Sequence, residues 1–290
     1  MPNNFDLVSK HVTLLDEQFR LESKTNVLES GSEIVRMGAK ANEFLIPKYD
    51  LDGLADYSRT DGYADGSANL EWESKKPNYD RGRTFSVDAM DNDETIDQAF
   101  GLLASQFMKH KVVPEMDAMR FATYAGTTGI NSISETFADA NAICKSLMNA
   151  NSIMDEAEIG SESRYLFITP TLHNMVKALD SYKSRSMLEG YAQIIDVPQA
   201  RFYTAIDLLD GKTTGETLGG YKKSASGKNI NYMIIYKPAV LQFTKHIVSK
   251  VISPAENQTM DAWKFFYRAY GLTDVFDNKV KGIYCSYGAA

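Results

Sequence analysis

The feature that most constrains this chain is a long polar stretch between two segments with strand-like composition. Residues 33–48 and 82–90 are rich in Val, Ile, Phe and Thr with partial alternation, which is typical of strands. More than thirty residues rich in Asp, Gly, Ser and Tyr separate them, with Asp-Gly turn signals at 52–53, 61–62 and 65–66. Connections this long are uncommon inside a compact domain and are usually functional or disordered. The pattern therefore predicts a long protruding hairpin that docks on another chain.

Large side chains of the kinds favoured at protein interfaces lie toward the end of this polar stretch. They are Trp72, Tyr79, Arg81 and Arg83. Aromatic residues and arginine are enriched where proteins meet, and they suit a solvated loop poorly. We therefore expect residues of about 50–82 to be poorly ordered in an isolated subunit and ordered against a neighbour, with these four side chains at the contact.

The N-terminal thirty residues form a polar lead-in with one regular feature. Val8, Val12, Leu15 and Phe19 recur at helical spacing and give a narrow apolar stripe. A helix this short is marginal alone and needs a surface to lie on. The stripe is equally consistent with packing on the chain's own domain and with packing on a neighbouring molecule.

A long helix is predicted over residues 91–129. The acidic and amide side chains of 91–94 suit its N-terminus, because they cap free N–H groups and complement the helix dipole. Pro114 removes a helical hydrogen bond, so a kink or a restart is expected there. Gly126 and Gly129 are expected to end the element. The apolar positions that follow helical spacing are Ile96, Ala99, Leu102, Leu103 and Phe107.

From about residue 130 onward, helical and strand-like patterns alternate. A helix is predicted over 134–153, and a second one begins at Thr169-Pro170, where Pro at the first helical position costs no hydrogen bond. A polar segment at 211–229 predicts a mobile surface loop. The predicted strands are 165–168, 194–198, 232–236, 240–243, 246–252, 263–270 and 280–287. With no internal repeat, the pattern indicates an α+β fold.

Charge and cysteine content exclude several classes of protein. The net charge is −7 and no block of Lys or Arg stands out, whereas proteins that grip nucleic acid by its phosphates usually carry a basic patch. Cys144 and Cys285 have no metal-ligand spacing and are read as reduced core residues. The N-terminus does not resemble a secretion signal, and no apolar run reaches membrane-spanning length. We expect a soluble protein made in a cytosol, with no membrane partner.

The sequence contains no complete catalytic, cofactor-binding or metal-binding motif. The Gly-Lys pairs at 211–212 and 227–228 lack the earlier glycine that a phosphate-binding loop needs. Dinucleotide-binding and α/β-hydrolase signatures are absent. The acidic residues of 91–94 fit a helix cap better than a calcium loop. Zinc has no support, because no two histidines are at ligand spacing among His11, His110, His173 and His246. The sequence thus predicts no catalytic residue, no cofactor and no metal, and a protein that is not an enzyme.

The order of these parts resembles a known family. Five segments carry the resemblance: 76–83 and 88–94 at the loop return and helix entry, 113–120 in the long helix, and 197–204 and 262–268 further on. The chain resembles the major capsid proteins of tailed bacteriophages, whose fold is shared with encapsulin shells. The resemblance spans nearly the whole chain and is strongest for phages that infect low-GC Gram-positive bacteria.

The resemblance implies a division of the chain. Residues 1–30 would be the N-terminal arm, 31–90 the extended two-stranded loop, and 91–129 the spine helix of the peripheral domain. Residues 130–240 would form most of the axial domain, which meets its copies at five- and six-fold vertices. Residues 241–290 would return as strands to the peripheral and axial domains.

The resemblance also implies a function. The chain would self-assemble as pentamers and hexamers into an icosahedral head shell that encloses phage DNA without sequence specificity, in the virion. A portal would be a further partner. Some relatives begin with a long, cleaved scaffolding segment, so we expect a separate scaffolding protein or a trimmed chain here. The alternatives are an encapsulin-like shell around a cargo protein, an α+β enzyme of unrecognised fold, and, disfavoured by the lack of repeats, a tail or adhesion component.

Overall fold

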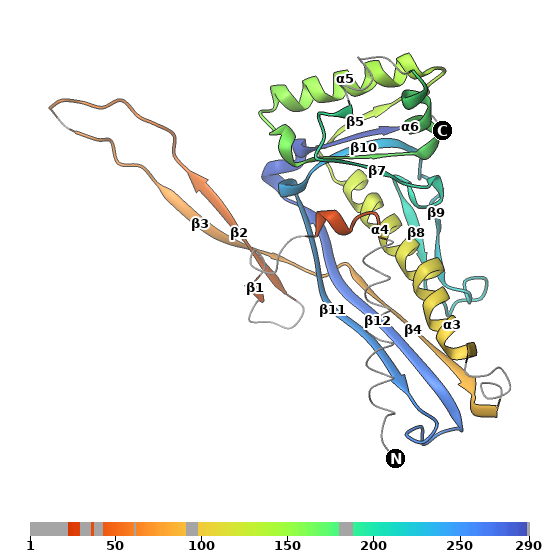
Figure 1. Cartoon of the computed structure of the whole chain (residues 1–290). Coiled ribbons are helices and arrows are strands. Elements are labelled where there is room, and N and C mark those ends of the chain that lie inside the picture. The colour runs from red at the N-terminus through yellow and green to blue at the C-terminus, as the bar shows by residue number, and fades with distance from the viewer. Residues whose placement is uncertain are drawn as a thin grey trace.

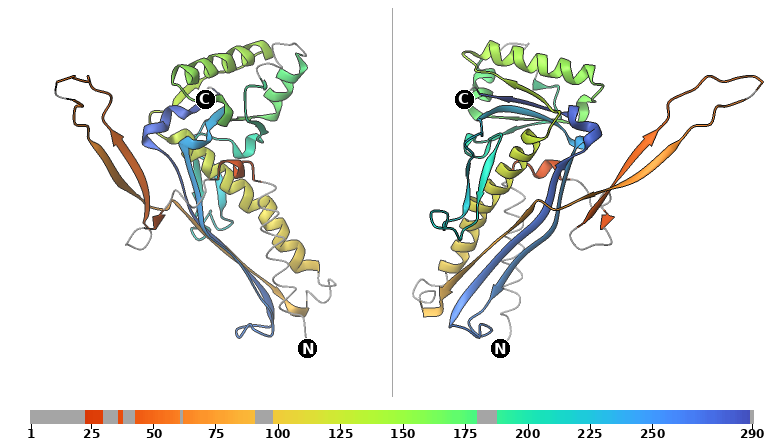
Figure 2. Two further views of the ribbon diagram at one scale, coloured as in Figure 1. Left: turned by 60° about the vertical axis from the view of Figure 1, so that its left-hand side comes forward. Right: turned by 180° about the vertical axis from the view of Figure 1, so that it is seen from behind.

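The computed structural model describes residues 23–29, 36–37, 43–60, 62–90, 98–179 and 188–288. It has three parts, which Figures 1 and 2 show from three sides. A compact domain of helices on a mixed sheet lies at one end. An elongated domain of three long strands and a helix extends away from it. A two-stranded ribbon projects to the side from the place where the two domains meet.

The elongated domain is an antiparallel sheet with a long helix against one face (Figure 1). In spatial order its strands are β11 (Val240–Ile252), β12 (Ala262–Val275) and β4 (Tyr79–Asp88). Alternate residues of β12 face the helix, and Phe265, Tyr267 and Ala269 are buried there with Met108 and Met116. Complete burial of a side chain such as Phe265 stabilises the fold by roughly 1.5–3 kcal/mol.

The helix changes its winding directly before its proline. It consists of α3 (Gln98–Phe107), a π-helical turn η2 (Met108–Val112) and α4 (Val113–Gly126). Pro114 lies in the first turn of α4 and cannot donate a backbone hydrogen bond, so the wider π turn upstream accommodates the change of register. The predicted restart at Pro114 and the end at Gly126 are confirmed. The acidic segment 91–94 lies outside the described residues.

The compact domain contains a five-stranded mixed sheet. In spatial order the strands are β5 (Asn131–Ser134), β13 (Ile283–Tyr287), β10 (Ile230–Tyr236), β6 (Arg164–Ile168) and β7 (Gln193–Asp196). The central pairs are antiparallel, whereas β5 and β7 join the edges in parallel. The sheet is buried on both faces, which explains the continuous apolar runs of β6 and β10.

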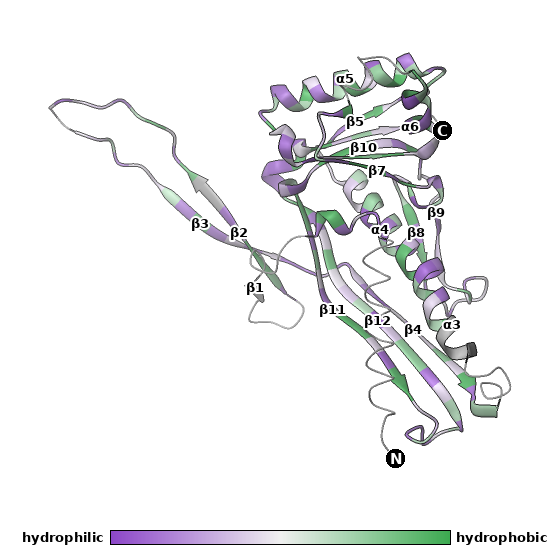
Figure 3. Cartoon of the chain, in the orientation of Figure 1, coloured by the Kyte–Doolittle hydropathy of each residue, from purple (hydrophilic) through white to green (hydrophobic). Residues whose placement is uncertain are grey.

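Helices cover both faces of this sheet. On one face lie α5 (Ala140–Glu156) and α6 (Pro170–Ala178), with Ile143 and Leu147 packed against Leu166 and Tyr232. Figure 3 shows the alternating hydrophobic and hydrophilic bands of α5 that produce this one-sided contact. On the other face, the C-terminal end of α4 contributes Phe121, whose ring meets those of Phe167 and Phe202 edge-on.

The ribbon and a second hairpin complete the fold. The ribbon pairs β2 (Phe44–Leu51) with β3 (Ala68–Lys75), and β1 (Arg36–Met37) adds to its base. The second hairpin, β8 (Ile206–Leu209) with β9 (Gly220–Lys223), lies beside the long helix (Figure 1). The remaining short turns are η1 (Asn26–Leu28), η3 (Ser161–Ser163), η4 (Gln199–Arg201), η5 (Lys237–Ala239) and η6 (Asp277–Gly282).

Several expectations differ from the structure. The flanking segments 33–48 and 82–90 do not pair with each other, because β3 closes the ribbon on β2 and leaves β4 free to join β12. The helix predicted from residue 134 begins at Ala140, because 131–134 pair with β13, and the Asp139 side chain caps the helix by accepting from Ala142 N at 2.8 Å.

Three further strand boundaries also differ. The two strands predicted at 240–243 and 246–252 are one strand, β11, with a bulge between Thr244 and His246. The loop predicted over 211–229 contains β9. The predicted strand 280–287 begins only at Ile283, after η6. The strands β6, β7 and β10 and the helix start at Thr169-Pro170 are confirmed.

Candidate assembly surfaces

The ribbon exposes large apolar side chains that have no core beneath them. Its strands pair from Phe44 opposite Lys75 to Leu51 opposite Ala68, and residues 52–67 form its tip. An isolated two-stranded hairpin is marginally stable in water, and clustered exposed apolar groups mark interaction sites. This surface therefore suits contact with another chain. The exposed apolar residues of the ribbon are Leu51, Leu54, Tyr57, Tyr63, Leu70 and Trp72.

The base of the ribbon is anchored in the subunit. Phe44 and Ile46 are buried with Leu241 and Leu272, and the Phe44 ring meets Phe243 edge-on at 5.6 Å between centroids. Because these residues pack on β11 and β12, the ribbon leaves the elongated domain in a defined direction. Its exposed part begins beyond this packed base.

A charged cluster at the base joins the ribbon to the end of β12. The Lys75 ammonium lies 2.9 Å from Glu73 Oε1, 3.2 Å from Asp274 Oδ2 and 3.8 Å from Asp277 Oδ1. Burial lowers the pKa of Lys75, but its hydrogen bonds to Glu73 and Asp274 outweigh that effect and raise the pKa above its ordinary value. Lys75 therefore stays charged and couples β3 to the chain after β12.

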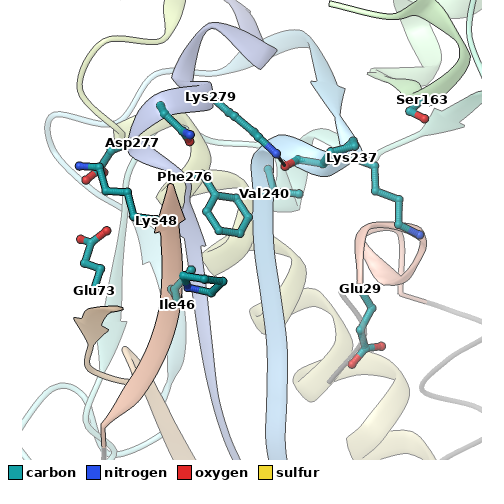
Figure 4. A pocket seen from close by; sticks show the side chains of 13 residues that line it. Glu29, Ile46, Lys48, Glu73, Ser163, Lys237, Val240, Phe276, Asp277 and Lys279 are labelled. Carbon is teal, nitrogen blue, oxygen red and sulfur yellow. Dashed lines mark hydrogen bonds between the residues drawn. The ribbon is translucent and has the colours of Figure 1, made fainter. Parts of the chain in front are cut away.

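An open hollow of about 590 Å³ lies beside this cluster (Figure 4). Its apolar wall includes Ile46, Pro47, Val240 and Phe276, and charged side chains surround the wall. We refer to it as the basal hollow. The charged residues that line it are Glu29, Lys48, Glu73, Lys237, Asp277 and Lys279. Since several separate segments meet there, no local sequence pattern could have revealed it.

Arg81 and Arg83 lie on the helix-facing side of β4, and the structure describes both with partners in their own chain. Arg81 Nε donates to Glu115 Oε1 at 2.7 Å, and its Nη atoms donate to the carbonyls of Leu209 and Gly220 at 2.8 and 3.2 Å. Arg83 donates to the carbonyls of Leu218 and Thr217 at 3.0 and 3.2 Å. The two arginines thus clamp the β8–β9 hairpin to β4.

Glycine is favoured where this clamp closes, because the backbone of residue 219 has a positive φ. Gly219 has a φ of +64°, and a Cβ placed there would lie 2.8 Å from Arg83 Nη1. At least one glycine of the segment 211–229, which was predicted to be a mobile loop, therefore lies in close contact with Arg83.

Tyr79 and Trp72 lie in different surroundings. Tyr79 is only 5% exposed, packs in the core under the long helix, and donates to Glu115 Oε1 at 3.3 Å. Its burial and the nearby Glu115 carboxylate raise the pKa of its phenol. Trp72, on β3, is 39% exposed. Of the four interface candidates on this stretch, Trp72 and Arg83 are exposed, Arg81 is partly buried and Tyr79 is buried. Val8, Val12, Leu15 and Phe19 lie outside the described residues.

A buried carboxylate anchors the chain that precedes the ribbon. Asp117 on α4 is fully buried and accepts five hydrogen bonds from two segments. Its donors are Ser23 Oγ at 2.8 Å, the N–H groups of Lys24 at 3.0 Å and Thr25 at 3.2 Å, Thr25 Oγ1 at 2.8 Å and Arg201 Nη1 at 3.0 Å. Sequence reasoning missed this site, because a single Asp in a helix reads as a solvated residue.

Other polar residues extend this anchor into the elongated domain. Arg120 Nη1 donates to Thr25 Oγ1 at 2.9 Å, and Gln242 Nε2 donates to the Thr25 carbonyl at 3.0 Å. The phenol of Tyr124 donates to Gln242 Oε1 at 3.0 Å. Buried polar groups are costly unless their hydrogen bonds are satisfied. The residues that follow the N-terminal segment are therefore held in place by α4 and β11.

The described residues contain no group of three His, Cys, Asp or Glu side chains placed to hold a metal ion. Both cysteines are unpaired, and burial raises the pKa of the Cys285 thiol to about 12, so it stays protonated and unreactive. His173 Nδ1 lies 2.6 Å from Asp196 Oδ1 at the C-terminal end of β7. None of the described helices is long and apolar enough to cross a bilayer.

The fold matches solved structures, although comparison of the sequence finds no match. No protein-family model and no curated protein sequence matches this chain. A virus-like particle from Pyrococcus furiosus aligns with a TM-score of 0.59 at 10% identity, over 96% of this chain and 98% of that one.

Phage capsids align similarly. The capsid structure of cyanophage P-SCSP1u has a TM-score of 0.54 at 14% identity, over 90% of this chain and 86% of that one. That of Staphylococcus phage Andhra has 0.54 at 12% identity, over 91% and 84%. The chain therefore has the α+β fold of phage capsid subunits, as its sequence resemblance implied.

Proposed function

We propose that this chain is the major capsid protein of a tailed phage. Many copies would assemble into an icosahedral head shell around DNA, in the virion, without acting as an enzyme and without a cofactor. The observation that carries the proposal is the pairing of the capsid fold with a projecting ribbon whose apolar side chains face solvent in the single chain.

Each of the three parts of the structure fits a separate role in such a shell. The compact domain, formed by most of residues 130–240 together with β13, would surround the five- and six-fold axes as the axial domain. The elongated domain, with the spine helix of 91–129 and the long strands β11 and β12, would be the peripheral domain, so that residues 241–290 return to both domains. The ribbon, within 31–90, and the arm, residues 1–30, would reach over neighbours. Trp72 is our leading contact residue on the ribbon, with Val8, Val12, Leu15 and Phe19 on the arm.

Many weak contacts are enough to hold such a shell together. Contacts made by ribbons and arms can each be weak, because closure of the shell links every subunit to several others. The net charge of −7 suits a container that must hold packed DNA without adhering to it everywhere. A scaffolding protein and a portal would be the further partners, and the host would be a low-GC Gram-positive bacterium.

The composition of assembled particles tests the proposal. Particles recovered from the producing host should sediment as large shells and contain nuclease-protected DNA. An encapsulin-like compartment would contain a specific cargo protein and no DNA, and an enzyme would remain a small oligomer with turnover. Either result would contradict the proposal.

A further inference from the structure

We propose that the ribbon tip carries a site of spontaneous self-modification, the Asp65-Gly66 bond, where the main chain rearranges to an isoaspartyl linkage. The reaction needs only water, so the inference goes beyond the proposed function and does not depend on it. Asp-Gly pairs are the dipeptides most open to this rearrangement, because glycine has no side chain to obstruct it. The chain contains four of them, at 52–53, 61–62, 65–66 and 210–211. Asp61 lies outside the described residues.

The chemistry is an internal exchange of bonds. The backbone nitrogen of the glycine attacks the side-chain carboxyl carbon of the aspartate, a C–N bond forms, and water leaves with the carboxyl hydroxyl and the amide proton. Water then opens the resulting succinimide ring. Opening at the main-chain carbonyl breaks the original peptide bond and leaves the chain linked through the side chain of the aspartate. One water molecule is released and one is consumed, so the product has the mass of the starting chain.

Two conditions govern how fast such a pair reacts. The carboxyl must be in its neutral form, because hydroxyl leaves far more readily from an acid than from a carboxylate. The side chain and the backbone must also be free to turn until the carboxyl carbon meets the next nitrogen. Hydrogen bonds to the carboxylate work against both conditions, since they favour the charged form and fix its position.

Asp65 and Gly66 satisfy the conditions best. Both residues are exposed and lie in irregular backbone before β3. Within the part of the chain that the structure describes, Asp65 makes no hydrogen bond and no ion pair, and nothing lies within 4 Å of a Cβ built on Gly66. The carboxyl group is therefore free to turn onto the Gly66 nitrogen, and the main chain is free to follow.

The same dipeptide is locked at Asp210-Gly211. Thr213 Oγ1 donates to Asp210 Oδ2 at 2.5 Å, and the N–H groups of Lys212 and Thr213 donate to Oδ1 at 2.7 and 2.8 Å. The hydrogen bond from the Thr213 side chain and those from the two backbone groups lower the pKa of Asp210 to about 2. Its neutral form is then on the order of tens of times rarer than in an ordinary Asp. Gly211 is held as well, with a φ of +72° and Arg83 Nη1 3.3 Å from the position of a Cβ.

Asp52-Gly53 falls between these two pairs. Asp52 Oδ2 accepts from Ser67 N at 2.7 Å, and Asp52 N donates to the Ser67 carbonyl at 3.1 Å. The carboxylate is thus held against the other side of the ribbon, and one hydrogen bond must break before it can reach the Gly53 nitrogen. Gly53 itself has open surroundings. The structure therefore ranks the described pairs, with Asp65 first, Asp52 second and Asp210 last.

Ageing of the purified full chain tests this order. The protein is incubated below its melting temperature, and peptide mapping separates isoaspartyl peptides from parent peptides of equal mass. Isoaspartate at Asp65 should exceed that at Asp210 at least roughly tenfold, because the neutral fractions differ by that factor or more. In water enriched in heavy oxygen, the rearranged peptide should carry the heavy isotope. If Asp65 does not lead the three sites, or if its isoaspartate contains no solvent oxygen, the inference is wrong.

Three further comparisons show whether the fold sets the order. In urea, the difference between Asp65 and Asp210 should nearly vanish, because glycine follows both and the folded contacts are gone. Thr213→Ala removes a donor to Asp210 and should raise isoaspartate there several-fold while Asp65 is unchanged.

Gly66→Ala is the matched control at the reactive site. The added methyl group should suppress the reaction at Asp65 by obstructing the attack, and the open surroundings of Gly66 accommodate it. The variant should melt at the same temperature as the parent. An order of reactivity that persists in urea, or undiminished isoaspartate in Gly66→Ala, would refute the inference, whether or not the protein forms shells.

Discussion

At the scale of single residues, Asp117 shows how one side chain can determine where a segment begins. Its carboxylate binds the backbone and side chains of residues 23–25 and also Arg201, while it is buried on α4. The part of the N-terminal arm that precedes Ser23 would therefore leave every subunit from the same point. Reproducible departure points matter in a shell, because each arm must reach an equivalent surface.

Asp117→Asn should weaken the isolated subunit. The amide keeps the shape of the side chain but loses the charge and one acceptor, and it leaves Arg201 without its ionic partner. Removing one member of a buried charged network costs roughly 3–5 kcal/mol, and urea denaturation of unassembled protein would measure the loss. Asp80→Asn is the matched control. Asp80 pairs with Arg268 at 2.7 Å on the surface, so its removal should change stability much less. Equal effects would show that Asp117 does not anchor the chain.

Trp72→Ala should impair assembly and leave the subunit folded. An interface tryptophan commonly contributes on the order of 2 kcal/mol per contact, and repetition over every subunit would block shell formation. Light scattering would follow assembly, and thermal melting would follow the subunit. Trp263→Ala is the matched control, because Trp263 packs against the subunit's own core and its loss should lower the melting temperature. If Trp72→Ala instead unfolds the subunit, Trp72 belongs to the chain's own core.

At the scale of elements, the proposed function ties the long helix and the ribbon most closely to assembly. Pro114→Ala should allow the α-helical register to continue through the turn at 108–112, which restores a backbone hydrogen bond. The subunit should keep or gain stability, while particle size or yield changes with the altered helix. Electron microscopy of mutant shells would measure this. Particles of unchanged size and number would mean that the proline is incidental.

The ribbon tip should be dynamic before assembly and protected afterwards. Residues 52–67 make few hydrogen bonds to the rest of the subunit, so their amides should exchange rapidly in the unassembled protein. Protection should appear in particles, while β12 should be protected in both states. Hydrogen exchange followed by mass spectrometry would resolve the segments. A tip that exchanges equally fast in subunit and shell would contradict its docking.

Elements with strong local signals could be predicted from sequence, but their partners could not. The run Tyr165–Ile168 and the pair Thr169-Pro170 predicted β6 and the start of α6 because each pattern is local. In contrast, β4 pairs with β12, which is almost two hundred residues away in the chain. The start of α5 was misplaced because pairing of β5 with β13 overrides local propensity.

The candidate surfaces also differ in whether the local sequence could predict them. Composition pointed to the ribbon and to Trp72, since aromatic residues in an Asp-Gly-rich stretch are unusual locally. Burial of Tyr79 and the clamp formed by Arg81 and Arg83 depend on β8, β9 and the long helix, which only the folded chain brings together. The basal hollow and the Asp117 anchor each join segments separated by tens to hundreds of residues. Their signals are therefore absent from any short stretch of sequence.

At the scale of the whole molecule, assembly should need no metal ion. The described residues hold no cluster of three metal-ligating side chains, and the contacts that stabilise the two domains are apolar contacts, hydrogen bonds and ion pairs. Shell yield should therefore be the same in EDTA and in buffer with magnesium, as followed by light scattering. Loss of shells in EDTA that a divalent ion restores would show that a metal participates.

Cryo-electron microscopy of particles formed by the purified protein tests the central claim most directly. The account predicts closed icosahedral shells in which compact domains surround the five- and six-fold axes and each ribbon crosses a neighbouring subunit. Small oligomers of fixed size, or open filaments, would contradict it.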